Sequence, residues 1–177
     1  MAAFKIDSVF NRLDSLELSS CLFCNRLTRW RMIKSFFATV SRLGDGIVWY
    51  SLMLVMAILD YPRGILVTAH MLLVGLLGLM VYKLLKGKMV RQRPSITWSQ
   101  IRRGTAPLDL YSFPSGHTLH AISFTLIAIN AYPFLGWVLI PLAMLIALSR
   151  VVLGLHYPSD VLVGGMIGGG MAMWSLA

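Results

Sequence analysis

The chain of 177 residues carries 16 Lys and Arg against 7 Asp and Glu, and 57% of its residues are hydrophobic, with a mean hydropathy of +0.73. About a quarter of the residues of a soluble domain are charged, whereas only 13% are charged here. A soluble globule of this size would lack the polar surface to cover so many apolar side chains. The composition therefore excludes an ordinary cytosolic enzyme, a disordered tail and a disulfide-rich secreted module, and it predicts a membrane protein.

Residues 1–43 differ from the rest because basic side chains interrupt every apolar run. No uncharged stretch is long enough for the apolar part of a signal peptide. Leu, Ile, Phe and Trp recur between the charges, as in a helix that lies in the membrane surface. We expect residues 1–43 to form a basic amphipathic interfacial helix; a basic cytosolic tail is the alternative interpretation.

Residues 44–177 are expected to form a membrane-embedded, all-α helical bundle with about five spans. A spanning helix needs roughly 20 mostly apolar residues, and a helix satisfies its own backbone hydrogen bonds in lipid. Pro133 predicts a turn between the third and fourth spans, because Pro is poorly tolerated inside a helix. The spans are expected at residues 46–59, 64–85, 115–131, 134–152 and 161–177.

The last predicted span is rich in glycine. Gly164 and Gly168, and likewise Gly165 and Gly169, are spaced four residues apart. Small residues at this spacing let two helix backbones approach closely. We therefore expect the last span to pack tightly against another helix.

Polar residues gather at three places, each at the end of a predicted span. Residues 86–94 follow the second span, residues 113–117 open the third, and residues 149–160 join the fourth to the fifth. The ends of the second and fourth spans and the starts of the third and fifth face the same side of the membrane. The three clusters are therefore expected to converge on one pocket.

The charges of these clusters favour an anionic ligand. Lys86, Arg93 and Arg150 bring three positive charges, and Asp160 is the one carboxylate among them. Arg offers a planar fork that matches phosphate oxygens, and Lys adds a point charge. Ser115-Gly116 at the start of a helix would present free N–H groups to an anion. We expect a phosphate site with no metal ion and no cofactor.

Two histidines supply the chemistry that phosphoryl transfer needs. A neutral imidazole can attack phosphorus, and a protonated one can give its proton to the leaving oxygen. His156 and Asp160 are four residues apart, which predicts that the carboxylate accepts the Nδ1–H of the ring and orients it. The hypothesis assigns His156 as the nucleophile and His117 as the acid.

The three motifs together, Lys-x6-Arg-Pro, Pro-Ser-Gly-His and Ser-Arg-x5-His-x3-Asp, resemble the complete signature of the type 2 phosphatidic acid phosphatase superfamily. The resemblance covers residues 46–177. It implies a metal-independent membrane phosphatase that acts on a lipid phosphate or diphosphate through a phosphohistidine intermediate. It also implies catalytic roles for His156, His117 and Asp160, and phosphate binding by Lys86, Arg93, Ser115, Gly116 and Arg150.

Many members of this superfamily have six spans, and the five counted here leave the entry path of the lipid open. The short chain resembles the compact bacterial enzymes that handle undecaprenyl diphosphate or phosphatidylglycerophosphate, and we rank the former first. The expected partners are a phosphorylated lipid substrate and membrane lipids, with no nucleic acid, because the basic residues flank spans.

Other interpretations keep the same residues. His117 and His120 form an H-x2-H pair, which favours zinc in other contexts, but the neighbouring cations oppose a metal ion. A phosphotransferase, or a phosphatase acting on another phosphorylated lipid or a soluble sugar phosphate, would use the same pocket. A non-enzymatic lipid-binding protein would have no need for His117, His156 and Asp160 together.

The expected location is the bacterial inner membrane, with a conflict over which face carries the pocket. Five spans place the amino terminus on the same side as the three clusters, and Arg63 is the one basic residue opposite. The positive-inside rule would put that side in the cytoplasm. The resemblance implies the outer face, and we lean towards the periplasm.

Overall fold

A computed structural model describes residues 2–106 and 109–177, with the side chains of residues 2–9 left out. The described residues form helices and connecting segments, with no strand among them. Met1 and part of the side chains of the predicted segment 1–43 lie outside the described residues. The α-helices are α1 (Ala2–Asn25), α2 (Arg31–Arg42), α3 (Val48–Leu59), α4 (Arg63–Lys88), α5 (Pro94–Thr97), α6 (Gly116–Ala131), α7 (Gly136–Val152) and α8 (Pro158–Leu176).

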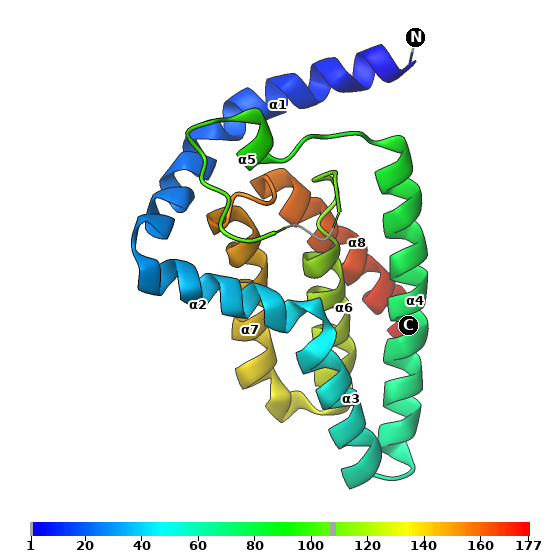
Figure 1. Cartoon of the computed structure of the whole chain (residues 1–177). Helices are drawn as coiled ribbons and strands as arrows, with labels where there is room; N and C mark the ends of the chain where they lie inside the picture. The colour runs from blue at the N-terminus through cyan, green and yellow to red at the C-terminus, as the bar shows by residue number, and fades with distance from the viewer. Residues whose placement is uncertain (1, 107–108) are drawn as a thin grey trace.

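Each of the five apolar segments that the sequence marks is helical, as α3, α4, α6, α7 and α8. The predicted turn near Pro133 is confirmed, because α6 ends at Ala131 and a 3-10 turn over Pro133–Leu135 leads into α7. The α3–α4 and α6–α7 connections lie at one end of the bundle (Figure 1). The end of α4, the start of α6, the end of α7 and the start of α8 lie at the other end, together with α5 (Figure 1).

The close packing predicted for the last apolar segment is confirmed for one of its two glycine pairs. A Cβ atom on Gly164 would lie 2.4 Å from the backbone oxygen of Ser115, and one on Gly168 would lie 2.1 Å from that of Leu119. No larger side chain fits at these two positions. The contact between α8 and α6 holds the start of both helices, and with them residues 115–117 and 158–160, in one place.

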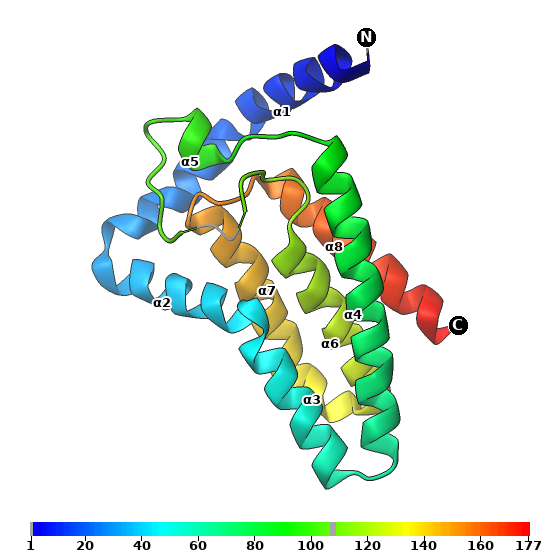
Figure 2. The same cartoon turned by 45° about the vertical axis from the view of Figure 1, so that its right-hand side comes forward.

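The amino-terminal region forms two helices rather than the single helix expected. A 3-10 turn (Arg26–Arg29) separates α1 from α2, and both helices pack against α7. A π-helical turn (Leu43–Ile47) joins α2 to α3, and Gly46 has a φ of 129° there, which disfavours any residue with a Cβ. The chain therefore bends sharply, and α2 crosses the bundle while α3 runs along it, as both views show (Figures 1 and 2).

Three helical stretches are long and apolar enough to cross a membrane: Arg31–Leu59, Arg63–Lys88 and Pro133–Val152. The bend at Gly46 divides the first of them. Large apolar side chains remain exposed along the bundle, including Leu66 at 69% and Trp137 at 87%. An exposed apolar surface of this extent is typical of a protein whose surroundings are lipid.

Candidate functional site

A cavity of about 410 Å³ opens at the end of the bundle where the three polar clusters meet. Residues from α4, α6, α7 and the α2–α3 bend line its walls. Five of the residues that the sequence analysis singled out lie together in its lining: Arg93, Gly116, His117, Arg150 and His156.

His156 lies in the segment between α7 and α8 and is 2% exposed. The Nη1 atom of Arg93 lies 3.3 Å from its Nε2 atom. A guanidinium group only donates, so Nε2 accepts and the ring proton resides on Nδ1. Burial, and next the charges of Arg150 and Arg93, lower the pKa of His156 well below its ordinary value of 6.5. His156 lines the cavity as a neutral ring, and Arg93 holds its unprotonated Nε2 atom.

Asp160 lies behind His156, in the first turn of α8, and is fully buried. Its Oδ2 atom accepts a hydrogen bond of 2.8 Å from the backbone N–H of Tyr157, and its Oδ1 atom lies 2.5 Å from Arg91 Nη1. Oδ2 is 3.7 Å from the Nδ1 atom of His156, which has no hydrogen-bond partner. The pairing predicted from the four-residue spacing is therefore a contact longer than a hydrogen bond.

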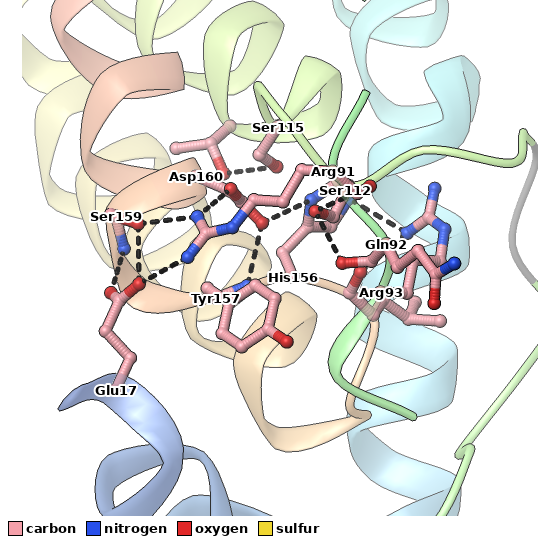
Figure 3. Close-up of polar contacts among 12 residues, drawn as sticks. Glu17, Arg91, Gln92, Arg93, Ser112, Ser115, His156, Tyr157, Ser159 and Asp160 are labelled. Carbon is pink, nitrogen blue, oxygen red and sulfur yellow. Dashed lines mark hydrogen bonds and ion pairs between the residues drawn. The ribbon is translucent and has the colours of Figure 1, made fainter. Parts of the chain in front are cut away.

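Arg91 is a residue that the sequence analysis missed, and it joins α1 to Asp160. Its guanidinium group is 1% exposed and bonds to Asp14 at 2.8 Å and Glu17 at 2.8 Å, as well as to Asp160. Glu17 also accepts hydrogen bonds from the backbone N–H and hydroxyl of Ser159. Figure 3 shows Arg91 between Glu17 of α1 and Asp160 of α8. We call these five residues the α1 cluster.

Lys86 and Arg93 form a second polar group on the opposite side of His156. Both bind one carboxylate, that of Asp109, whose Oδ1 atom lies 2.5 Å from Lys86 Nζ and 2.8 Å from Arg93 Nη2. Tyr82 donates a hydrogen bond to the other oxygen. Burial alone would raise the pKa of Asp109, but hydrogen bonds from Lys86 and Tyr82 and the positive charges lower it below the ordinary value. Asp109 is a second residue that the sequence analysis missed.

Arg150, near the end of α7, differs from the other buried cations. It is 3% exposed and lines the cavity. Its Nη1 atom donates to the hydroxyl of Ser41 in α2, and its Nε atom has no hydrogen-bond partner. Within the part of the chain that the structure describes, no carboxylate forms an ion pair with it. A buried guanidinium without a counter-ion is costly, so the cavity is electrostatically suited to an anion.

His117 lies in the first turn of α6, and its Nε2 atom contacts a carboxylate oxygen of Asp45. Asp45 belongs to the bend between α2 and α3 and was also missed by the sequence analysis. A carboxylate only accepts hydrogen bonds, so the Nε2 atom of His117 carries a hydrogen. The pair therefore gives the cavity a histidine that can carry a proton.

Ser115 and Gly116 occupy different positions relative to the cavity. Gly116 lines it, whereas Ser115 is fully buried and its hydroxyl pairs with that of Thr118 at 3.0 Å. The backbone N–H of Ser115 donates to the carbonyl oxygen of Asp160. The amide of Ser115 thus ties α6 to α8, and of the two residues only Gly116 lines the cavity.

Among the side chains of residues 10–106 and 109–177, no three His, Cys, Asp or Glu converge in a way that would hold a metal ion. His120 of the H-x2-H pair places its Nδ1 atom 2.9 Å from the carbonyl oxygen of Gly116 and its Nε2 atom 3.1 Å from that of Gly75. Both ring nitrogens are thereby occupied, and His120 ties α6 to α4.

The sequence model described as PAP2 superfamily matches residues 66–177 of the chain. Phosphatidylglycerophosphatase B of Haemophilus influenzae is 37% identical in an alignment of 67 positions that covers 32% of this chain and 28% of that protein. Undecaprenyl-diphosphatase of Sulfolobus acidocaldarius is 37% identical over 71 residues, 40% of this chain and 34% of that protein. The chain thus matches about a third of the length of these relatives.

Two solved structures share the fold over most of the chain. LpxE of Aquifex aeolicus superimposes with a TM-score of 0.80 at 27% identity, covering 91% of this chain and 94% of the other. The PAP2-type phosphatidylglycerolphosphate phosphatase of Bacillus subtilis superimposes with a TM-score of 0.68 at 24% identity, covering 98% and 93%. The second likeness concerns the fold alone.

Proposed function

The chain belongs to the PAP2 superfamily, and from that premise we propose that it is a metal-independent membrane phosphatase that hydrolyses a lipid phosphate or diphosphate. The observation that carries the proposal is Arg150, a buried guanidinium without a counter-ion that lines the same cavity as His117 and His156. A phosphoryl group supplies the negative charge that Arg150 lacks. It also places phosphorus between a neutral imidazole and a proton-bearing one.

The proposed reaction has two steps. Nε2 of neutral His156 attacks phosphorus, the bond from phosphorus to the leaving oxygen breaks, and His117 gives that oxygen its proton. His117 then takes a proton from water, whose oxygen attacks phosphorus and breaks the bond to His156, releasing inorganic phosphate. Arg150, Lys86 and Arg93 hold the phosphoryl oxygens, and Gly116 offers the backbone at the start of α6. Asp160 stabilises the positive charge on His156 across 3.7 Å, and buried Ser115 holds α6 against α8.

The apolar part of the cavity favours a lipid over a soluble sugar phosphate. Beyond the polar end the lining continues along α3, α4 and α6 with apolar and aromatic side chains. Several of them are largely exposed, among them Tyr50 at 64% and Leu76 at 58%. An acyl or isoprenyl chain could therefore leave the cavity sideways into the membrane while its phosphate stays at Arg150. The apolar lining consists of Trp49, Tyr50, Leu72, Leu76, Leu79 and Phe124.

The names of the relatives give the substrate classes to test first. They include a phosphatidylglycerophosphatase and an undecaprenyl-diphosphatase, and we rank undecaprenyl diphosphate ahead of phosphatidylglycerophosphate. The protein purified in detergent, with EDTA present, should release phosphate from one of these two or from phosphatidic acid, and more slowly from a soluble sugar phosphate. His156→Ala should release none. Loss of activity in EDTA would contradict the proposal, and so would phosphate release by His156→Ala at the rate of the natural protein. No release from any substrate would favour phosphotransfer or lipid binding.

For the membrane we propose five spans, α3, α4, α6, α7 and α8, with α1 and α2 at the surface, in the bacterial inner membrane. Residues 1–43 then form the surface part and residues 44–177 the embedded domain. The crossing of α2 over the bundle supports this placement (Figure 2). We place the cavity on the periplasmic side. A thiol-specific reagent that does not cross the membrane should label Ser99→Cys in intact cells, after Cys21 and Cys24 are replaced by Ser; protection until the cells are opened would place the cavity in the cytoplasm.

A further inference from the structure

Asp109 accepts hydrogen bonds from Lys86 and Arg93, whose N–H groups the proposed function assigns to the phosphoryl group of the substrate. Four of the five N–H groups of Arg93 are engaged, and two of these four go to Asp109, one to its carbonyl oxygen at 3.2 Å and one to its carboxylate at 2.8 Å. Lys86 gives one of its three donors to the same carboxylate at 2.5 Å and another to Tyr82 at 2.5 Å. Without a ligand, the carboxylate of Asp109 therefore lies where phosphoryl oxygens would bind.

The carboxylate of Asp109 and a phosphoryl group cannot both bind Lys86 and Arg93 without electrostatic repulsion. A phosphoryl group bound to Lys86 and Arg93 would meet the carboxylate within a few ångströms, where like charges repel each other. The side chain of Asp109 is 34% exposed, whereas those of Lys86 and Arg93 are 10% and 2% exposed. Asp109 is thus the partner with access to water, and it belongs to the segment between α5 and α6 rather than to a helix of the bundle.

We infer that Asp109 is an internal competitor for phosphate: it leaves Lys86 and Arg93 when the substrate binds and returns to them to expel inorganic phosphate after hydrolysis. The inference rests on the proposed function and adds a step to it. Arg93 and Arg150 line the cavity, and Lys86 is linked to Arg93 through Asp109. These cations would otherwise retain the product, and product release limits the turnover of many enzymes. Arg150 has no such carboxylate and remains the first contact for an incoming phosphate.

Binding of orthophosphate tests the inference without relying on turnover. Titration calorimetry on the detergent-purified full chain should show that Asp109→Asn binds orthophosphate at least about tenfold more tightly than the natural protein, because the competing charge is removed. Asp60→Asn is the matched control, since Asp60 bonds to Tyr132 at the opposite end of the bundle. Its affinity for orthophosphate should equal that of the natural protein. Asp109→Asn that binds orthophosphate equally or more weakly would overturn the inference and make Asp109 a residue that orients the two cations.

A second measurement guards against misfolding of the variant. Asp109→Asn leaves Lys86 and Arg93 without a counter-ion, so its melting temperature should be lower than that of the natural protein. Saturating orthophosphate should raise the melting temperature of the variant by more than that of the natural protein, because a tighter ligand stabilises more. An equal or smaller rise contradicts the inference.

Failure of the inference and failure of the proposed function give different results. If the natural protein releases phosphate from the lipid panel but Asp109→Asn shows no gain in orthophosphate affinity, the inference alone is wrong. If the natural protein and Asp109→Asn both bind no orthophosphate and no lipid is hydrolysed, the phosphate site itself is wrong, and the inference falls with it.

Discussion

Arg91 and Arg150 are both buried guanidinium groups, yet their surroundings are opposite. Arg91, 1% exposed, faces three carboxylates in the α1 cluster and lies away from the cavity. Arg150, 3% exposed, faces the cavity and forms no ion pair with any described carboxylate. His156 and Asp160 lie between the two regions, with Arg91 behind Asp160 and Arg93 beside His156.

The charge of Arg91 stabilises the fold through ion pairs within the chain, whereas the charge of Arg150 is free to bind an anionic ligand. In the α1 cluster, one cation against three carboxylates leaves the region negative and its hydrogen bonds satisfied within the chain. At the cavity, the buried guanidinium group of Arg150 has no ion-pair partner among the described carboxylates. Removing a partner from the first region should therefore cost stability, and removing a charge from the second should cost activity.

The largest effect on stability is expected for Arg91→Met. The substitution leaves the buried Asp14 and Asp160, and the half-buried Glu17, without their cation. Breaking a buried pair in this way costs about 3–5 kcal/mol. The melting temperature in detergent, measured by scanning calorimetry, should fall by several degrees. Arg63→Met, at the opposite end of the bundle, is the control and should change it little. An Arg91→Met protein as stable as the natural one would show that α1 is not held through this cluster.

Arg150→Met should lower activity rather than stability. It removes a buried charge that has no counter-ion, so the melting temperature of the ligand-free protein should stay the same or rise. Activity should fall about 10²–10³-fold in kcat/KM, as when one stabilising donor is removed from a transition state. Phosphate release and melting curves from the same preparation test both halves. A large loss of stability with activity retained would make Arg150 part of the scaffold.

The pH dependence of stability should show that His156 is neutral in the folded protein. The folded protein keeps this ring neutral below its ordinary pKa of 6.5, while the unfolded chain takes up a proton there. The unfolded state then binds more protons, so the free energy of unfolding falls as the pH drops below about 6.5, by at most about 1.4 kcal/mol per pH unit for one group. Melting temperatures between pH 7 and pH 5 should fall less steeply for His156→Gln. Equal slopes would mean that His156 is charged in the folded protein.

The smallest effect is expected for Glu17→Gln. The amide keeps one oxygen to accept hydrogen bonds from Arg91 and Ser159 but loses the negative charge, which should lower stability by about 1–2 kcal/mol. With the charge of Glu17 removed, Arg91 would interact more strongly with Asp160, so activity should fall only a few-fold. Calorimetry and phosphate release measure the two effects. A loss of activity as large as that of Arg150→Met would place α1 in the reaction itself.

The course of the helices could be predicted from the sequence because apolar runs and Pro133 mark their bounds locally. The motifs also predicted a common location for Arg93, His117, Arg150 and His156, since alternating spans bring their ends to one side. The sequence analysis placed the change from surface helix to span between residues 43 and 46, but it did not identify the sharp bend there, which depends on Gly46 and its positive φ. The turn-forming residues Gly44-Asp45-Gly46 could have given this signal.

The carboxylates around the site were missed because their partners are far away in the sequence. Asp45 and His117 are 72 residues apart, and Glu17 and Arg91 are 74 apart. One signal was present: the chain has only 7 acidic residues. Each of the six whose side chains are described bonds to a cation, a histidine or a tyrosine. In so apolar a chain, each acidic residue merits a search for its partner.

The most direct test of the central claim is to trap the phosphorylated protein. Substrate carrying ³²P in its terminal phosphate is mixed with the purified protein and quenched within milliseconds in alkali, which preserves a phosphorus–nitrogen bond. The account predicts label on the peptide that contains His156, lost on treatment with acid and absent from His156→Ala. Label that persists in His156→Ala, or that resides on a hydroxyl side chain, would contradict it.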